Sequence, residues 1–143
     1  MVQQVGKECV EQDVPFFLEF VGYDAGGDLS RLGYARQKPE IVTESIREFS
    51  QDQYHVDLLK VEIPVSLPFI SGTRWCEGSE TTYSRDEAME LYLRASSVAR
   101  RPFIYLSAGA SSSQFHESLT WVVEVGVRFS GVLCGRHEYS STQ

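Results

Sequence analysis

Four short apolar runs lie along the chain and alternate with longer amphipathic stretches. Each run is too short for a helix, is rich in aromatic and β-branched residues, and is nearly continuous in apolarity. This pattern predicts strands that are buried on both faces, as in a parallel sheet covered by helices. The predicted strands are residues 15–21, 56–64, 102–108 and 129–134.

The stretches between these runs carry helix signals. We expect Pro39 to open one helix, because its missing N–H does no harm in a first turn. The buried stripe of this helix is predicted to be Val42, Ile46 and Phe49. A capping box at residues 84–87 predicts the start of a second helix. Its inward positions are Ala88, Leu91, Tyr92, Ala95, Val98 and Ala99.

A third helix is predicted to start at Ser111, where Gln114 completes the cap, and to end at Gly126. Its inward positions are Phe115, Leu119, Val122 and Val123. The first dozen residues predict one more helix, so helix and strand alternate four times. This order predicts an α/β fold with a parallel sheet. Two long connections, residues 22–38 and 66–83, follow strand ends where βα folds build active sites.

The composition is that of an ordinary globular domain, and we expect residues 1–143 to form a single domain. The net charge of −7 argues against a nucleic-acid partner. We expect no membrane contact and no secretory signal, because no apolar run is long enough and the amino terminus is polar. Three widely spaced cysteines, Cys9, Cys76 and Cys134, fit a reducing cytoplasm and no disulfide framework.

Lys60 is the least expected residue of the second strand, because the residues around it are mostly apolar. A buried cation costs several kcal/mol unless it is paired or neutralised. A lysine that escapes this cost by losing its proton is a nucleophile able to form a Schiff base with a carbonyl. The alternative is a structural lysine that reaches water or pairs with Glu62 on the same strand face.

Glu19 stands among the aromatic residues of the first strand. A carboxylate buried there without a partner would have a raised pKa, which suits general acid/base chemistry, and a salt-bridged structural glutamate is the alternative. Adjacent parallel strands lie about 4.8 Å apart, so Glu19 and Lys60 can share one site.

Small residues end the other two strands: Ser107 and Gly109 end the third, and Gly135 precedes Arg136 after the fourth. Backbone N–H groups can approach an anion there, and a guanidinium adds a fixed charge, so the pattern predicts a phosphate site. Ordinary turn chemistry is the alternative for Ser107 and Gly109. The histidines lack ligand spacing and no nucleotide motif occurs, so we expect neither a metal nor a cofactor.

In collinear order over nearly the whole chain, these segments resemble the class I tagatose 1,6-bisphosphate aldolases and the related sulfofructosephosphate aldolases. The resemblance rests on residues 15–20 (Pro-Phe-Phe-Leu-Glu-Phe), Tyr23 and Asp24, and residues 38–39, 56–65, 83–88, 102–109 and 131–136.

The resemblance implies a TIM barrel, (βα)8, and an aldolase that needs no metal. It assigns the role of Schiff-base lysine to Lys60 and that of acid/base glutamate to Glu19. The implied phosphate contacts are Ser107, Gly109, Gly135 and Arg136. The implied reaction cleaves a phosphorylated ketose, tagatose 1,6-bisphosphate, into dihydroxyacetone phosphate and glyceraldehyde 3-phosphate.

Such a barrel needs about 250 residues, whereas this chain has 143. We therefore expect a half-barrel that corresponds to the last four βα units of the family. Its unpaired edges predict either a homodimer or pairing with the missing half-barrel. The alternatives are a sulfofructosephosphate-type aldolase and an inactive fragment with a phosphosugar-binding or regulatory role.

Overall fold

Four parallel strands form one sheet in the order β1–β2–β5–β6. The strands are β1 (Phe17–Glu19), β2 (Leu58–Glu62), β5 (Phe103–Leu106) and β6 (Gly131–Leu133). The computed structural model describes residues 1–22, 31–76, 78 and 80–133. The four strands confirm the predicted parallel sheet, although each is shorter than the apolar run that contains it.

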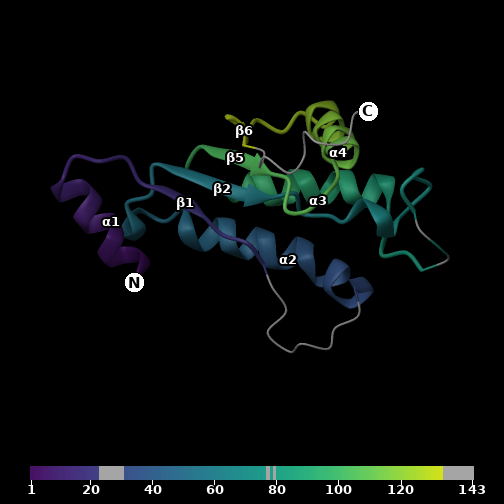
Figure 1. The fold of residues 1–143 in the computed structure, drawn as a ribbon, viewed down its shortest axis with the longest axis horizontal. Coiled ribbons are helices and arrows are strands. Elements are labelled where there is room, and N and C mark those ends of the chain that lie inside the picture. The colour runs from purple at the N-terminus through teal and green to yellow at the C-terminus, as the bar shows by residue number, and fades with distance from the viewer. Residues whose placement is uncertain (23–30, 77, 79, 134–143) are drawn as a thin grey trace.

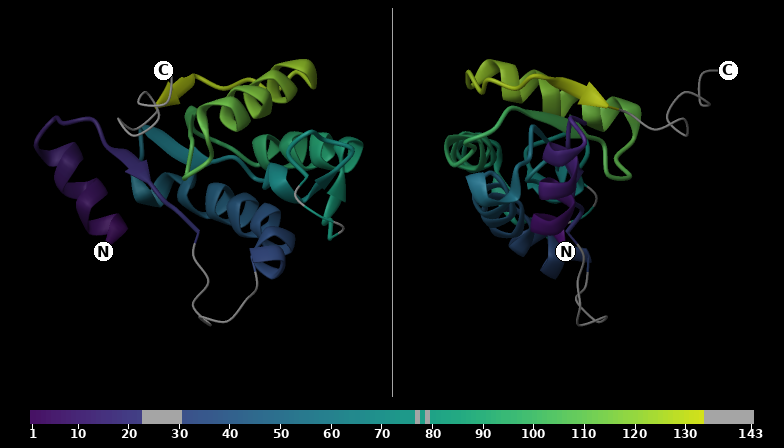
Figure 2. Two further views of the ribbon diagram at one scale, coloured as in Figure 1. Left: turned by 45° about the vertical axis from the view of Figure 1, so that its right-hand side comes forward. Right: turned by 90° about the vertical axis from the view of Figure 1, so that its left-hand side faces the viewer.

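Four α-helices alternate with these strands, and they are α1 (Val2–Glu11), α2 (Arg31–Phe49), α3 (Arg85–Ser97) and α4 (Ser112–Glu124). Figures 1 and 2 show α2 and α3 side by side along one face of the sheet, whereas α1 lies beyond the end of the sheet. The capping boxes predicted at Ser84 and Ser111 are both present, at the starts of α3 and α4.

Alternate residues of the central strands point into the layer of helices. Leu59 and Val61 of β2 are fully buried, and Phe103 and Tyr105 of β5 nearly so. They form one apolar cluster with residues of α2, α3 and α4: Val42, Ile46, Ala88, Tyr92, Ala95, Phe115, Trp121 and Val122. Burying each large side chain of this kind stabilises the fold by about 1.5–3 kcal/mol. Most of the inward helix positions predicted from the sequence are therefore confirmed.

The prediction that Pro39 opens a helix is wrong. The helix α2 already begins at Arg31, and Pro39 lies inside it. A proline in a helix interior costs about 3 kcal/mol, because it removes a backbone hydrogen bond and its ring crowds the preceding turn. The turns before Pro39 nevertheless pack inward, since Ala35 and Lys38 are both buried. This burial offsets the cost and extends the helix upstream of the proline.

The burial expected for the outer strands and for one residue of α4 is also wrong. The strands β1 and β6 each pair with one neighbour among the described residues, and Phe17 and Leu133 are more than half exposed. Val123 is 65% exposed, because the inward face of α4 passes through Ser118 and Trp121 instead.

The long connection between β2 and α3 is structured. It contains a 3-10 turn, η2 (Leu67–Phe69), and two short parallel strands, β3 (Ile70–Ser71) and β4 (Tyr83–Ser84). A second 3-10 turn, η1 (Asp52–Tyr54), precedes β2. Within the described ranges, no helix combines the length and the apolar character needed to cross a membrane.

Candidate active site

The side chains of Lys60 and Glu19 meet on neighbouring strands. The parallel register places Glu19 of β1 directly beside Lys60 of β2. The Nζ atom of Lys60 donates a hydrogen bond to Oε2 of Glu19 at 2.7 Å. At this distance a proton can pass directly between the amine and the carboxylate. The predicted juxtaposition of the two residues is therefore confirmed.

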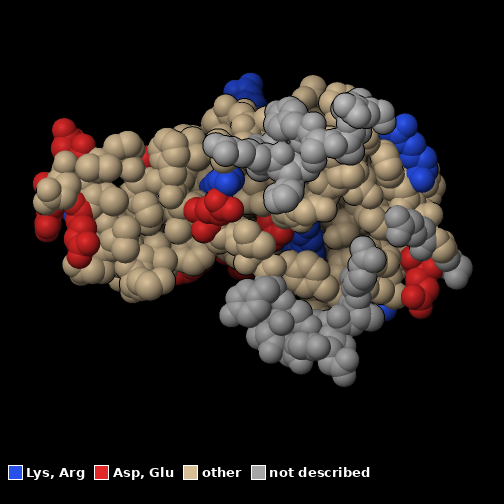
Figure 3. Space-filling view, viewed as in Figure 1, with Lys and Arg blue, Asp and Glu red and all other residues tan. Residues whose placement is uncertain are grey.

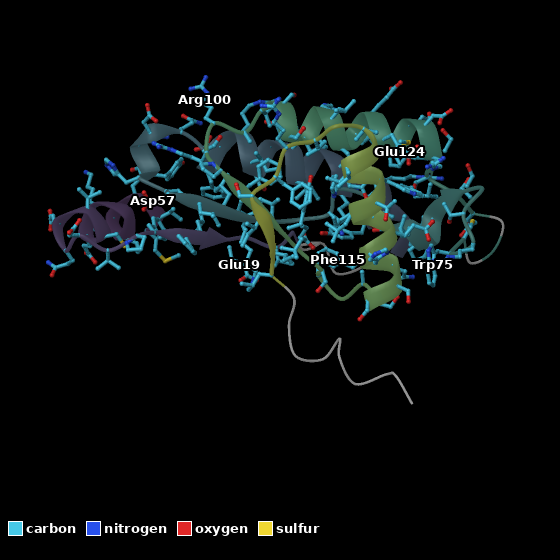
Figure 4. The ribbon with its side chains drawn as sticks, turned by 90° about the horizontal axis from the view of Figure 1, so that it is seen from above. Glu19, Asp57, Trp75, Arg100, Phe115 and Glu124 are labelled. Carbon is cyan, nitrogen blue, oxygen red and sulfur yellow. The ribbon has the colours of Figure 1, made fainter. Side chains whose placement is uncertain are left out.

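This pair lies on the side of the sheet that the helices leave open. Figure 4 shows Glu19 on the side of the sheet turned away from α3. The Glu19 side chain is 50% exposed and that of Lys60 is 19% exposed. Glu19 is therefore neither buried nor without a partner, because alternation along β1 places it on the open face, and its contact is the ion pair of the alternative interpretation. Pairing of Lys60 with Glu62 is wrong, since Lys60 binds Glu19.

Glu62 instead forms a second, closed pair with a lysine of α2. Its Oε1 atom lies 3.9 Å from Nζ of Lys38, and both side chains are at most 10% exposed. Burial lowers the pKa of Lys38, and the negative charge of Glu62 offsets part of that shift. Such a pair is costly to desolvate and costlier to break, because either partner alone would be a buried charge.

The sequence analysis missed this closed pair, although a signal was present. Tyr34 and Lys38 precede Val42 and Ile46 at intervals of four residues, so all four share one face of α2. Extending the apolar stripe upstream through Pro39 would have placed Lys38 against the sheet. Its counter-charge would then have been sought among the carboxylates of β2.

The same carboxylate also holds the chain that leaves β1. The backbone N–H of Gly22 donates to Oε2 of Glu62 at 2.8 Å, and the hydroxyl of Tyr34 donates to the Gly22 carbonyl at 2.8 Å. Burial, with a further contribution from the charge of Glu62, raises the pKa of Tyr34 to about 12. Tyr34 therefore keeps its proton, and can donate, throughout the neutral range.

A cleft of about 280 Å³ opens at the carboxyl-terminal ends of β2 and β5. Its lining includes Ser107 and Gly109 of the predicted phosphate site, together with Lys38, Ser66 and Gln114. The helix α4 begins three residues after Gly109 and directs its amino-terminal end toward this region. The cleft thus offers small polar groups and one buried cation at the end of the sheet where βα folds bind ligands.

Neither Lys60 nor Glu19 lines this cleft. Ile104, the register partner of Lys60, lies three residues before Ser107. At a rise of about 3.3 Å per residue, the cleft begins about 10 Å further along the strands. Figure 3 shows acidic and basic side chains next to one another across the middle of the face seen in Figure 1. The remaining predicted contacts, Gly135 and Arg136, lie outside the described residues, as do Tyr23, Asp24 and Cys134.

The described residues thus bring together a parallel sheet, a lysine–glutamate pair on its open face and a polar cleft at its carboxyl end. Residues 1–141 match the DeoC/LacD family of aldolases, and the chain belongs to this family. Its four parallel strands and their helices correspond to part of the (βα)8 barrel of that family.

The chain is similar to tagatose 1,6-diphosphate aldolases from Enterococcus and Staphylococcus. Tagatose 1,6-diphosphate aldolase 1 of Enterococcus faecalis is 45% identical over 136 residues, which are 94% of this chain and 41% of the relative. Tagatose 1,6-diphosphate aldolase 2 of the same organism is 46% identical over 94% of this chain and 40% of the relative. The Staphylococcus haemolyticus aldolase is 41% identical over 97% of this chain and 42% of the relative. The chain thus spans about two fifths of the length of these relatives.

Proposed function

We propose that this chain carries the nucleophile and the acid/base group of a class I aldolase, Lys60 and Glu19. The observation that supports the proposal most directly is the 2.7 Å contact between Lys60 Nζ and Glu19 Oε2. An amine must lose its proton before it can attack a carbonyl, and Glu19 is placed to take that proton. The open face of the sheet leaves room for a substrate beside both groups.

In the proposed reaction, the neutral amine of Lys60 attacks the ketone carbon of the substrate. Glu19 returns the proton to the carbinolamine hydroxyl, which leaves as water and forms an iminium. The bond between the carbon next to the iminium and the carbon beyond it donates its electrons to the iminium, while Glu19 removes the proton of the hydroxyl on that farther carbon. That bond breaks, an aldehyde departs, and the resulting enamine is protonated. Hydrolysis then frees the second product and restores Lys60.

The proposed substrate is a ketose bisphosphate, tagatose 1,6-bisphosphate, and its products are dihydroxyacetone phosphate and glyceraldehyde 3-phosphate. The names of the relatives support this choice. We assign one phosphate to the end of the sheet, where Ser107 and Gly109 line the cleft, and we include Gly135 and Arg136 in this phosphate site. Phosphate binding there would hold the ketone beside Lys60, so that binding energy positions the reacting atoms.

Binding of a phosphosugar without turnover is a second candidate. The half-exposed Glu19 favours it, because water competes for a carboxylate that is not enclosed. A second copy of the chain or another half-barrel that covers the open face would remove this competition. Turnover would then depend on assembly, whereas phosphate binding in the cleft would not.

The test is reduction with borohydride in the presence of dihydroxyacetone phosphate, followed by peptide mass spectrometry. The chain contains three lysines, Lys7, Lys38 and Lys60, so the adduct can be assigned without ambiguity. We expect the adduct on Lys60, and we expect none in Lys60→Met. Lys7 is exposed on α1 and serves as the internal control. An adduct on Lys38 or Lys7 instead of Lys60 would contradict the assignment.

A further inference from the structure

The carboxyl-terminal end of β1 is held by a bracket around one residue, Gly22. The backbone N–H of Gly22 binds the carboxylate of Glu62, and its carbonyl binds the hydroxyl of Tyr34, both at 2.8 Å. Gly22 lies three residues after Glu19. Both polar groups of its backbone are therefore satisfied by side chains from two other elements, β2 and α2. We call Gly22, Glu62 and Tyr34 the Gly22 bracket.

The bracket leaves no room for a side chain. A Cβ atom at Gly22 would lie 2.7 Å from the Tyr34 hydroxyl oxygen and 3.1 Å from Cγ2 of Ile41. A side chain there would therefore push the Tyr34 hydroxyl away from its hydrogen bond with the Gly22 carbonyl. A contact this tight restricts where the end of β1 can lie relative to β2.

The Gly22 bracket adds to the other contacts of β1, which are its pairing with β2 and the packing of Phe16, Leu18 and Phe20 against the core. The strand has three residues and pairs only with β2 among the described residues. Its contact through Glu19 is half exposed, and a surface ion pair contributes about 0–1 kcal/mol. At the other end of the strand, the N–H of Phe16 donates to Asp57 at 2.8 Å, but both residues lie near solvent. The Gly22 bracket is a partly buried polar anchor at the carboxyl end of β1, and its carboxylate, Glu62, is itself buried.

We propose that Tyr34 and Glu62 are positioning residues, which fix the end of β1 and so hold Glu19 against Lys60. Lys38 supports the bracket, because its buried ammonium lies 3.9 Å from Glu62 and favours the charged carboxylate. The catalytic meaning of this inference rests on the proposed function. Its structural content, the dependence of the Glu19–Lys60 contact on the bracket, does not.

The test follows the side chain of Lys60 by NMR in the chain labelled with ¹⁵N-lysine. Three lysines give three side-chain signals, which single substitutions assign. Glu19→Gln supplies the reference signal of a Lys60 that has lost its ionic partner. We expect Tyr34→Phe and Glu62→Gln each to shift the Lys60 signal toward that reference. The signal of Lys7, on the exposed face of α1, should stay in place, and circular dichroism of each variant checks that the fold is retained.

Tyr83→Phe is the matched control. The Tyr83 hydroxyl also donates to a backbone carbonyl of α2, that of Arg36, at 2.6 Å. This variant removes an equivalent hydrogen bond without touching the Gly22 bracket, so the Lys60 signal should not move. An unchanged Lys60 signal in both bracket variants would overturn the proposal, and so would an equal shift in Tyr83→Phe.

Borohydride trapping on the same proteins separates this inference from the proposed function. A wild-type chain that never forms an adduct with dihydroxyacetone phosphate contradicts the proposed function and leaves the NMR comparison standing. A wild-type adduct on Lys60, together with unshifted Lys60 signals in the bracket variants, supports the function and contradicts the positioning role. If both the proposed function and the positioning role are correct, Tyr34→Phe should still form the adduct on Lys60, but its turnover should fall. Imine formation needs only the amine of Lys60, whereas turnover also needs Glu19 in position.

Discussion

The molecule contains two lysine–glutamate pairs that are two residues apart along β2 and differ in almost every physical respect. Lys60 and Glu19 approach to 2.7 Å on the open face, with side-chain exposures of 19% and 50%. Lys38 and Glu62 stay 3.9 Å apart, with exposures of 10% and 5%. The open pair can exchange a proton and can be reached by a substrate. The closed pair lies away from that face, with Lys38 at the wall of the cleft, and it holds the chain around it in place.

Both pairs join a lysine to a glutamate, so their different properties follow from how far each pair is buried. An exposed ion pair contributes little to stability, so its partners are free to separate when a substrate arrives. A buried pair loses much of its attraction to desolvation, but removal of one partner leaves an unpaired charge inside the protein. The lowered pKa of Lys38 reflects that burial, with Glu62 acting in the opposite direction.

The largest effect is expected on catalysis, from the open pair. In an active preparation, Glu19→Gln should reduce turnover by about 10²–10⁴-fold, the usual contribution of one acid/base group. Imine formation at Lys60 should remain detectable by borohydride trapping, because the amine is intact. Steady-state kinetics with the proposed bisphosphate measures the loss. Wild-type turnover in Glu19→Gln would mean that Glu19 is only a structural partner of Lys60.

The largest effect on stability is expected from the closed pair. Lys38→Met should lower the free energy of unfolding by about 3–5 kcal/mol, because Glu62 would remain buried without its counter-charge. Urea denaturation measures this change. Lys60→Met is the matched variant of the open pair and should cost about 0–1 kcal/mol. The double variant Lys38→Met/Glu62→Gln should recover most of the loss, and equal costs for the two single lysine variants would remove the distinction between the pairs.

A smaller decrease in the free energy of unfolding is expected when a methyl group is added at the Gly22 bracket. Gly22→Ala should lower the free energy of unfolding by about 1–3 kcal/mol, the usual cost of forcing an extra methyl group into a packed site. The 2.7 Å approach to the Tyr34 hydroxyl identifies the clash. Combining Gly22→Ala with Tyr34→Phe should relieve part of the cost in the same urea experiment. Equal costs with and without the Tyr34 hydroxyl would place the crowding elsewhere.

The smallest expected effect is the contribution of Tyr34 to the free energy of unfolding at alkaline pH. An unfolded tyrosine loses its proton near pH 10.0, whereas folded Tyr34 keeps it until about pH 12. Between these values the folded state binds more protons, so the free energy of unfolding falls as the pH rises. Tyr34→Phe should remove this part of the decline in the free energy of unfolding. Thermal or urea unfolding between pH 9 and 12 gives the comparison, and identical slopes in wild type and Tyr34→Phe would contradict it.

The strands, the capped helices and the meeting of Lys60 with Glu19 could be predicted from the sequence, because they depend on local periodicity and on the spacing of parallel strands. Glu62 was placed correctly on the same strand face as Lys60, but its partner was not. Residues two apart on a strand are separated by about 6.6 Å, so each can turn to a different neighbour. The partner of Glu62 depends on how α2 packs against β2, and the local signal for it is the four-residue spacing that places Lys38 on the same helix face as Val42 and Ile46. Pro39 indicated a helix start, so Lys38 was placed outside the helix and its burial was not predicted.

The exposure of Glu19 could not be predicted for a related reason, since it depends on what covers the sheet and not on the strand that carries the residue. The sequence of β1 is as aromatic as that of a central strand, but its position at an edge decides its environment. The order of strands in a sheet depends on the whole chain, so it cannot be predicted from residues 15–21 alone.

The outer edges of β1 and β6 have one further consequence. Among the described residues, each edge presents backbone donors and acceptors that no neighbouring strand uses. Any polypeptide that adds a strand there, including a second copy of this chain, binds the folded state and not the unfolded one. By mass action, the free energy of unfolding then grows with the concentration of that polypeptide. The stability of such a sheet therefore depends on the concentration of its binding partner as well as on the contacts within one molecule.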